Sequence, residues 1–204
     1  YILAGDRSVF SLCRPPGHHA SHDQFGGYCF INNAAVAAQH LRDRGLGKVA
    51  VLDVDFHHGN GTQAIFYDRS DVLFLSLHGD PMHAFPHFLG HADEIGNGEG
   101  EGFNFNYPLP AGTSFVEWNN CLRSALDQIA KFGADAVIIS LGVDTFERDP
   151  ISFFKLTSPD FIKMGASIAS LGLPTLFVME GGYAVEEIGI NTVNVLMGFK
   201  EKET

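Results

Sequence analysis

The sequence predicts an α/β fold in which helices flank an open, mostly parallel sheet. The first observation is a series of short apolar runs, each with the length and composition of a buried parallel strand. The second is that segments with helical capping residues lie between most of these runs, so strands alternate with helices. The third is that 45% of the 204 residues are apolar, which is enough for a single domain with a sizeable core over residues 1–204.

The first half of the chain contains three expected strands and two expected helices. An alanine-rich segment is typical of a helix, because Asn32 or Asn33 can cap its start and Gly45 can end it. The segment 13–20 forms a rigid turn, since two prolines and a glycine restrict its backbone. In order, the expected elements are a strand at 8–12, a helix at 32–44, a strand at 49–54, a short helix at 61–67 and a strand at 72–77.

The second half begins with a long irregular segment at 78–102, and loops of this length inside a compact domain are usually functional. An alternation of Phe and Asn after it predicts a strand at 103–109. Ser114 and Glu117 form a capping box that opens a helix to about Phe132. The remaining expected elements are a strand at 136–141, a loop at 142–156, a helix from Ser158 that Gly172 ends, a strand at 175–179, a turn at 180–183 and a helix at 185–197.

Charge and cysteine content narrow the classes of function. The net charge of −11 argues against nucleic acid as a partner and suits a cationic substrate. No window is apolar enough to span a membrane, and no signal peptide is visible. Cys13, Cys29 and Cys121 form no C-x-x-C pair, which favours a reducing compartment, so we expect a cytoplasmic protein. Because the chain begins at Tyr1, we expect an N-terminal portion of the domain to be missing from it.

Polar residues that are unusual beside buried strands follow four of the expected strands, at the point where each strand ends. The carboxyl ends of parallel strands meet at one edge of a sheet, and ligands of α/β folds bind at that edge. We therefore expect these side chains to gather in one site. In chain order, they are the pair His18 and His19, then Asp55 and His57, then Asp144, and finally Tyr183.

Asp55 and His57 form half of a divalent metal site. They lie two residues apart, so in extended geometry a carboxylate and an imidazole point to the same side. All ten histidines lie at or before His91, so a third ligand from the C-terminal half is acidic or is Cys121. Asp144 is the natural choice, although an aspartate at that place can equally cap a helix or form a turn. Three protein ligands leave one coordination position open, as in a catalytic site.

The adjacent pair His18 and His19 supplies acid–base groups. Asp53 and Asn60 are candidate partners, because an anion holds one ring charged and a neutral amide serves the other. Tyr183 can donate its hydroxyl to an oxyanion, or it can simply pack as an aromatic after a turn. A metal ion, a histidine base and a phenol donor together describe the hydrolysis of an amide or an ester, and do not distinguish the two.

Four segments of the chain resemble the zinc-dependent histone deacetylase superfamily. Two further segments, 144–151 and 183–194, look more like its branch of bacterial acetylpolyamine amidohydrolases than like the eukaryotic members. The resemblance runs over the whole chain and implies an arginase/deacetylase-like fold, of which this chain holds the larger C-terminal part. The four segments are Arg14-Pro-Pro-Gly-His-His-Ala20, Asp53-Val-Asp-Phe-His-His-Gly-Asn-Gly-Thr62, Leu141-Gly-Val-Asp144 and Glu180-Gly-Gly-Tyr183.

The resemblance also implies roles for individual residues. His19 would be the general base that activates water and then the acid that protonates the leaving amine. His18, paired with Asp53, would be its electrostatic partner, and Tyr183 would stabilise the tetrahedral oxyanion. The implied zinc ligands are Asp55, His57 and Asp144. The implied structural potassium site consists of Asp53, Asp55, His57, Ser76 and Leu77, partly through backbone carbonyls. The implied substrate tunnel is lined by Gly27, Tyr28, Phe85 and Ile151.

The favoured function is zinc-dependent hydrolysis of the acetyl amide of acetylated polyamines, such as acetylputrescine or acetylspermidine. Its substrate partner would be a small cation, and we expect the full-length protein to be a homodimer. The alternative is deacetylation of acetyl-lysine in proteins. A non-catalytic binding module would be expected to lack Tyr183, a histidine or a metal ligand, and a binuclear manganese site would need more carboxylates near 49–54. The metal is zinc or ferrous iron, because an Asp-His-Asp set accepts either ion.

Overall fold

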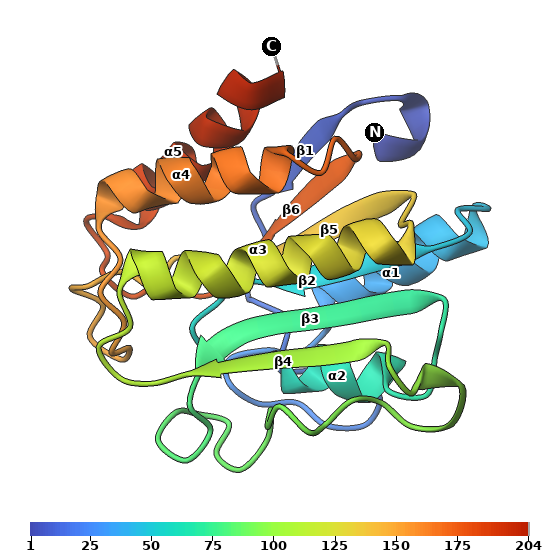
Figure 1. Cartoon of the computed structure of the whole chain (residues 1–204), viewed down its shortest axis with the longest axis horizontal. Helices are drawn as coiled ribbons and strands as arrows, with labels where there is room; N and C mark the ends of the chain where they lie inside the picture. Colours follow the sequence, from blue (N-terminus) through green and yellow to red (C-terminus); the bar gives the residue numbers. More distant parts are fainter. Residues whose placement is uncertain (204) are drawn as a thin grey trace.

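A six-stranded sheet, in which every strand pair is parallel, forms the centre of the computed structural model, which describes residues 1–203 (Figure 1). The strand order is β1-β6-β5-β2-β3-β4. This confirms the predicted α/β class with a parallel sheet. The strands are β1 (Ser8–Ser11), β2 (Val49–Asp53), β3 (Val72–Gly79), β4 (Asn104–Leu109), β5 (Ala136–Leu141) and β6 (Thr175–Met179).

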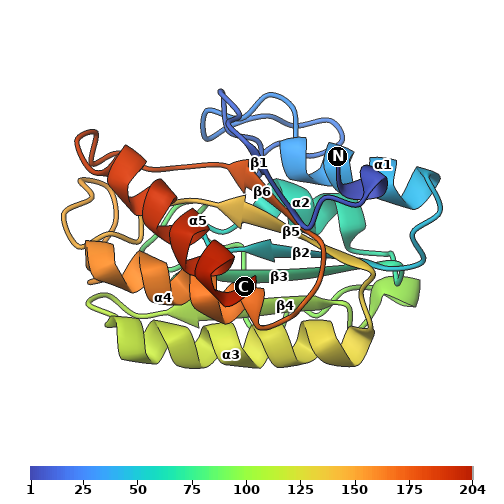
Figure 2. The same cartoon turned by 90° about the horizontal axis from the view of Figure 1, so that it is seen from above.

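Helices cover both faces of this sheet (Figure 2). Three of them, α3, α4 and α5, pack on one face, and α1 and α2 pack on the other. None of the described helices is long and apolar enough to cross a membrane. The helices are α1 (Asn33–Asp43), α2 (Asn60–Phe66), α3 (Phe115–Phe132), α4 (Ser158–Ala169) and α5 (Ile188–Glu203), with short 3-10 turns at Ile2–Ala4 and Gly98–Gly100.

The sequence of β2 explains why it lies at the centre of the sheet. Its neighbours are β5 and β3, and all five of its residues are buried. Ala50 and Leu52 contribute to the core under α3 and α4, whereas Val49 and Val51 contribute to the core under α1. A strand buried on both faces has no solvent-facing side, so it reads as an uninterrupted apolar run rather than an alternating one.

Two helices have boundaries that differ by more than one residue from the sequence prediction. The last helix begins at Ile188 rather than at 185, because residues 185–187 form a turn that is closed by bonds from the N–H groups of Glu187 and Ile188 to the Ala184 carbonyl. It also continues to Glu203, beyond the expected end at 197. The helix expected to reach Gly172 ends at Ala169, and the chain then turns through the left-handed backbone of Gly172.

The long irregular segment after β3 is fixed by a buried polar network. Strand β3 itself runs two residues further than predicted, to Gly79. The side-chain carbonyl of Gln63 accepts hydrogen bonds from the amides of Asn104 (3.0 Å) and Asn106 (2.8 Å). The Glu94 carboxylate accepts the backbone N–H groups of Gly90 and His91. The amides of Asn104 and Asn106 also donate to the backbone carbonyls of Glu94 and His91, which holds the segment against β4.

Candidate active site

Asp55, His57 and Asp144 meet at the carboxyl ends of β2 and β5. Nδ1 of His57 lies 2.9 Å from Oδ2 of Asp144 and 3.1 Å from Oδ1 of Asp55. All three side chains are buried, and one ligand atom from each lies within 4.8 Å of the others. The gathering expected from the strand ends is therefore present in the structure.

Backbone amides and two glycines position the carboxylates of this group. Oδ2 of Asp55 accepts the N–H of Gly181 at 2.8 Å, and Oδ1 of Asp144 accepts the N–H of Phe56 at 2.8 Å. A β-carbon at Gly142 would overlap Oδ2 of Asp55, and one at Gly181 would lie 2.7 Å from the same oxygen. The glycines that follow β5 and β6 are thus required by the close approach of backbone to carboxylate.

The electrostatics of this group fit a divalent cation. Burial and the nearby Asp55 carboxylate raise the pKa of Asp144 to about 7. Burial opposes the charged form of His57, but hydrogen bonds with Asp144 and Asp55 outweigh it and raise the pKa of that imidazole to about 10. The raised pKa values show that this buried group takes up positive charge in the form of protons, and a cation could take their place. The mixed N and O donor set is one that zinc and ferrous iron accept.

The two histidines of the turn have different partners. Nδ1 of His18 lies 2.9 Å from a carboxylate oxygen of Asp53, and Nδ1 of His19 lies 2.8 Å from the amide oxygen of Asn60. Burial opposes the charged form of His18, but the Asp53 anion outweighs it and raises the pKa of that ring. Burial and the adjacent charged His18 lower the pKa of His19 to about 3. The pair thus combines a charged ring with a neutral one, with the partners that the sequence suggested.

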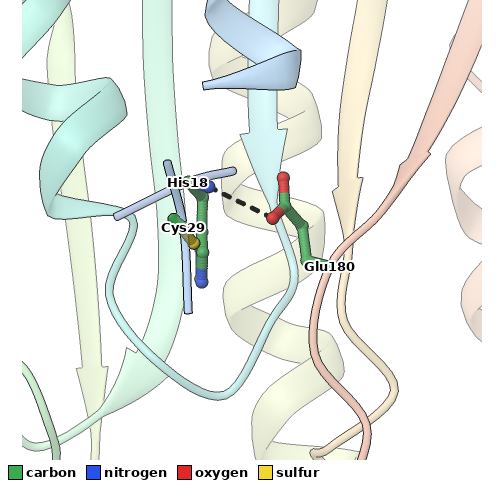
Figure 3. Close-up of side chains that lie close together, drawn as sticks. All are labelled: His18, Cys29 and Glu180. Atoms are coloured by element: carbon green, nitrogen blue, oxygen red, sulfur yellow. Dashed lines mark hydrogen bonds between the residues drawn. The ribbon is translucent and has the colours of Figure 1, made fainter. Parts of the chain in front are cut away.

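Glu180, to which sequence reasoning gave no role, holds this turn from the end of β6 (Figure 3). Its Oε2 accepts the backbone N–H groups of Gly17 (2.7 Å) and His18 (3.1 Å). The side chains of His18, Cys29 and Glu180 form a second buried group that could hold a metal ion. However, Nδ1 of His18 is already bonded to Asp53. Burial raises the pKa of Glu180 to about 7. The signal in the sequence was a charged residue directly after an apolar strand, which is rarely buried without a partner.

A cavity of about 400 Å³ opens beside the group of Asp55, His57 and Asp144, and His57 lines it. The expected tunnel residues all line it, and so do His19, His57 and Tyr183. The ring of Tyr183 lies 6.3 Å from that of His57 and 6.2 Å from that of Tyr28. The expected lining residues are Gly27, Tyr28, Phe85 and Ile151, and those that the sequence did not indicate are Phe56, His83, Ala84, His87 and Phe153.

Replacing Gly27 by alanine is expected to narrow this cavity and to displace the rings of His19 and Phe85 that line it. A β-carbon there would overlap the ring of His19 and lie 2.9 Å from the ring of Phe85. The residue also has a left-handed backbone (φ 52°), which costs other residues about 1–2 kcal/mol. We expect the catalytic efficiency kcat/KM to fall at least about tenfold. The matched control is Gly26→Ala, whose β-carbon meets no atom within 4 Å; equal losses in both variants would contradict this explanation.

The residues expected to bind potassium lie together in the strands, next to the group of Asp55, His57 and Asp144. Strand register pairs Asp53 with Ser76 on one side and with Ser140 on the other, and all three are fully buried. Leu77 follows Ser76 and is also fully buried. The hydroxyl of Ser76 is bonded to Nδ1 of His78 at 2.8 Å, whereas that of Ser140 has no partner among the described residues. The assignment of a cation to this place stays a prediction.

The fold and the site together define a class: a parallel α/β domain with a buried group of two carboxylates and an imidazole, which could hold a metal ion, at its strand ends. The model of the histone deacetylase domain matches residues 1–198. The chain is 68% identical over 199 residues to acetylpolyamine amidohydrolase 2 of Pseudomonas aeruginosa and 66% identical over 197 residues to acetylpolyamine amidohydrolase of Mycoplana ramosa. These alignments cover 98% and 97% of this chain, and 58% of each relative.

A solved structure matches this chain over nearly its whole length. The crystal structure of acetylpolyamine aminohydrolase from Burkholderia pseudomallei superimposes with a TM-score of 0.96 at 45% sequence identity. That alignment covers 98% of this chain and 58% of the other. The chain therefore belongs to the histone deacetylase family, and it spans somewhat more than half the length of the curated relatives it matches.

Proposed function

We propose that the protein containing this chain is a metal-dependent amidohydrolase that removes the acetyl group from acetylated polyamines, releasing acetate and the free amine. The observation that carries the proposal is the gathering of Asp55, His57 and Asp144 beside a neutral and a charged histidine under one cavity. High identity to relatives named acetylpolyamine amidohydrolase supports the substrate class, with acetylputrescine and acetylspermidine as its members.

Asp55, His57 and Asp144 would hold the ion, which we propose is zinc, with ferrous iron as the alternative. Such an ion supplies a Lewis acid that polarises the amide carbonyl and lowers the pKa of water. We propose potassium as a second, structural ion. It would lie near Ser76 and Leu77, and Asp53 would balance its charge.

His19 is the proposed general base and acid. Its Nδ1 faces the amide oxygen of Asn60, so Nδ1 carries the proton and Nε2 is free to accept one from water. The lowered pKa of His19 keeps its ring neutral, so that Nε2 carries no proton before the reaction begins. The same nitrogen then returns the proton to the leaving amine. His18 stays charged beside Asp53 and stabilises negative charge that develops nearby.

Tyr183 is the proposed donor to the oxyanion. Its ring lines the cavity, and burial together with the Asp55 and Asp144 carboxylates raises the pKa of its phenol. The hydroxyl therefore remains protonated at every pH at which the enzyme would work. A protonated donor fixed at the cavity wall can bond to the carbonyl oxygen as negative charge develops on it.

The cavity wall suits an alkyl chain that carries an ammonium group. Tyr28 and Phe85 present aromatic faces, which attract cations, and Ile151 adds an aliphatic surface. The net charge of −11 favours the approach of cationic substrates over anionic ones. We also propose that the full-length protein is a homodimer and that it works in the cytoplasm, where free thiols such as those of Cys13, Cys29 and Cys121 persist.

The decisive experiment compares kcat/KM of the metal-loaded full-length protein on acetylputrescine and on an acetyl-lysine peptide. We expect the polyamine to be preferred by at least about tenfold, a difference of about 1.4 kcal/mol in transition-state binding. Preference for the peptide would favour the alternative, a protein deacetylase. The chain is also 39% identical to a histone deacetylase-like amidohydrolase of Pseudomonas aeruginosa, which is why this alternative is tested. Turnover of neither substrate with metal bound would contradict the proposed function.

A further inference from the structure

We infer that Asp149 is a positioning residue for the proposed reaction, because its carboxylate fixes Tyr183 and Ile151 in the cavity wall. The inference rests on the proposed function and extends it to a side chain that does not itself line the cavity. Asp149 lies in the loop between β5 and α4, and Tyr183 lies in the loop after β6. One side chain thus joins the two loops that carry the proposed oxyanion donor and a wall of the substrate pocket.

Both carboxylate oxygens of Asp149 accept hydrogen bonds from the backbone. Oδ2 accepts the N–H of Tyr183 at 2.8 Å and that of Ala184 at 3.3 Å, and Oδ1 accepts the N–H of Ile151 at 3.1 Å. Only 6% of Asp149 is exposed to solvent, so water does not compete freely for these donors. Hydrogen bonds from N–H groups to an ionised carboxylate are stronger than those between neutral groups.

The loop that carries Asp149 is itself firmly anchored. Phe146 pairs with Leu156 across the base of the loop, and the N–H of Glu147 bonds to the Leu156 carbonyl at 2.8 Å. The N–H of Asp149 bonds to the Phe146 carbonyl at 2.9 Å, which closes a tight turn. Asp149 therefore starts from a fixed position and can impose that position on another segment.

The residues that it holds lie just beyond a stretch of backbone that has other partners, since the Gly181 N–H donates to Asp55 and the Gly181 carbonyl accepts the N–H of Val143. Tyr183 follows Gly181 and Gly182, which have no side chains to pack, and residues 180–184 belong to no helix or strand. An ion pair between Arg148 and Glu187 links the same two loops at the surface, but two-thirds of the Arg148 side chain is exposed. Exposed ion pairs contribute little, and the buried Asp149 carboxylate is the group that accepts the N–H of Tyr183 itself.

The test uses the metal-loaded full-length enzyme with acetylputrescine. We expect Asp149→Ala to lower kcat about 30- to 100-fold and to raise KM, because misplacing a catalytic group by about 1 Å can cost about a hundredfold. The bound metal should stay unchanged. Asp149→Asn keeps one acceptor oxygen. We expect this oxygen to face Tyr183 and Ala184, which offer two N–H donors, and the NH2 group to face Ile151, which offers one. We therefore expect it to recover most of kcat while KM remains raised.

A double-mutant cycle separates positioning from general stability. If Asp149 acts through the phenol, Asp149→Ala should lower kcat less than about threefold in a Tyr183→Phe background. The matched control is Asp160→Ala, which removes another buried carboxylate that accepts a backbone N–H, that of Thr157 at the start of α4. It should lower the melting temperature and leave kcat unchanged.

The outcomes distinguish this inference from the proposed function. Unchanged kcat and KM in Asp149→Ala, or an equal loss of kcat with and without the Tyr183 hydroxyl, would overturn the inference alone. A wild type that binds metal but hydrolyses no acetyl amide would overturn the proposed function and this inference with it.

Discussion

Replacing Asp144 by alanine is expected to remove the bound metal and to reduce kcat by at least about three orders of magnitude. Asp144 supplies one of the two carboxylates among the proposed metal ligands and is completely buried. Its loss leaves Asp55 and His57, which is one ligand fewer than a catalytic zinc site needs. The rate should follow the metal, because the Lewis acid is the main source of charge stabilisation in such reactions.

Elemental analysis of the purified variant is the measurement that checks this prediction. Asp144→Asn is the matched control for folding, since its amide oxygen can still accept the N–H of Phe56, which lies 2.8 Å from Oδ1 in the wild type. Both variants should lose metal, but only the alanine variant should also lose the support of the Phe56 backbone. A full complement of metal in Asp144→Ala would show that this aspartate is not a ligand.

Tyr183→Phe is expected to lower kcat by roughly two to three orders of magnitude, the usual effect of removing one oxyanion donor. The substitution removes only the hydroxyl, and the ring keeps its place in the cavity wall. The metal content should therefore remain that of the wild type. KM should change little, because the hydroxyl acts on charge that develops after the substrate is bound.

Steady-state kinetics beside metal analysis would check this second prediction. Tyr28→Phe is a suitable control, because Tyr28 lines the same cavity and its ring centre lies only 6.2 Å from that of Tyr183. Tyr28 is proposed to act through its aromatic face, so removing its hydroxyl should change kcat by less than about fivefold. Equal effects of the two substitutions, or near-normal turnover in Tyr183→Phe, would remove Tyr183 from its assigned role.

The sequence was sufficient to predict the class of fold and the gathering of certain polar side chains at the strand ends. Apolar runs such as β2 are recognisable because a strand buried on both faces must be apolar throughout. The grouping of Asp55 and His57 with Asp144 followed from the geometry of parallel strands, whose ends share one edge. That Asp53 would pair with one of the two histidines was accessible because a buried carboxylate needs a partner, whereas the choice of His18 came from the family resemblance.

The positioning carboxylates were not predictable in the same way. Asp149 and Glu180 act on backbone N–H groups, which every residue except proline has, so no residue type at the other end marks the contact. Glu180 and Gly17 are also separated by 163 residues. The start of the last helix was misplaced for a similar reason, since the turn at 185–187 depends on local hydrogen bonds rather than on periodicity.

The proposed metal ligands follow different strands, and this has a consequence for folding. Asp55 follows β2 and Asp144 follows β5, so an ion bound by both would act as a cross-link between distant parts of the chain. An unfolded chain would not present the complete set of ligands, and the ion would therefore bind the native state preferentially. By mass action, each tenfold rise in free metal above its dissociation constant would add about 1.4 kcal/mol to the free energy of unfolding. Metal supply would then set the lifetime of the folded protein as well as its activity.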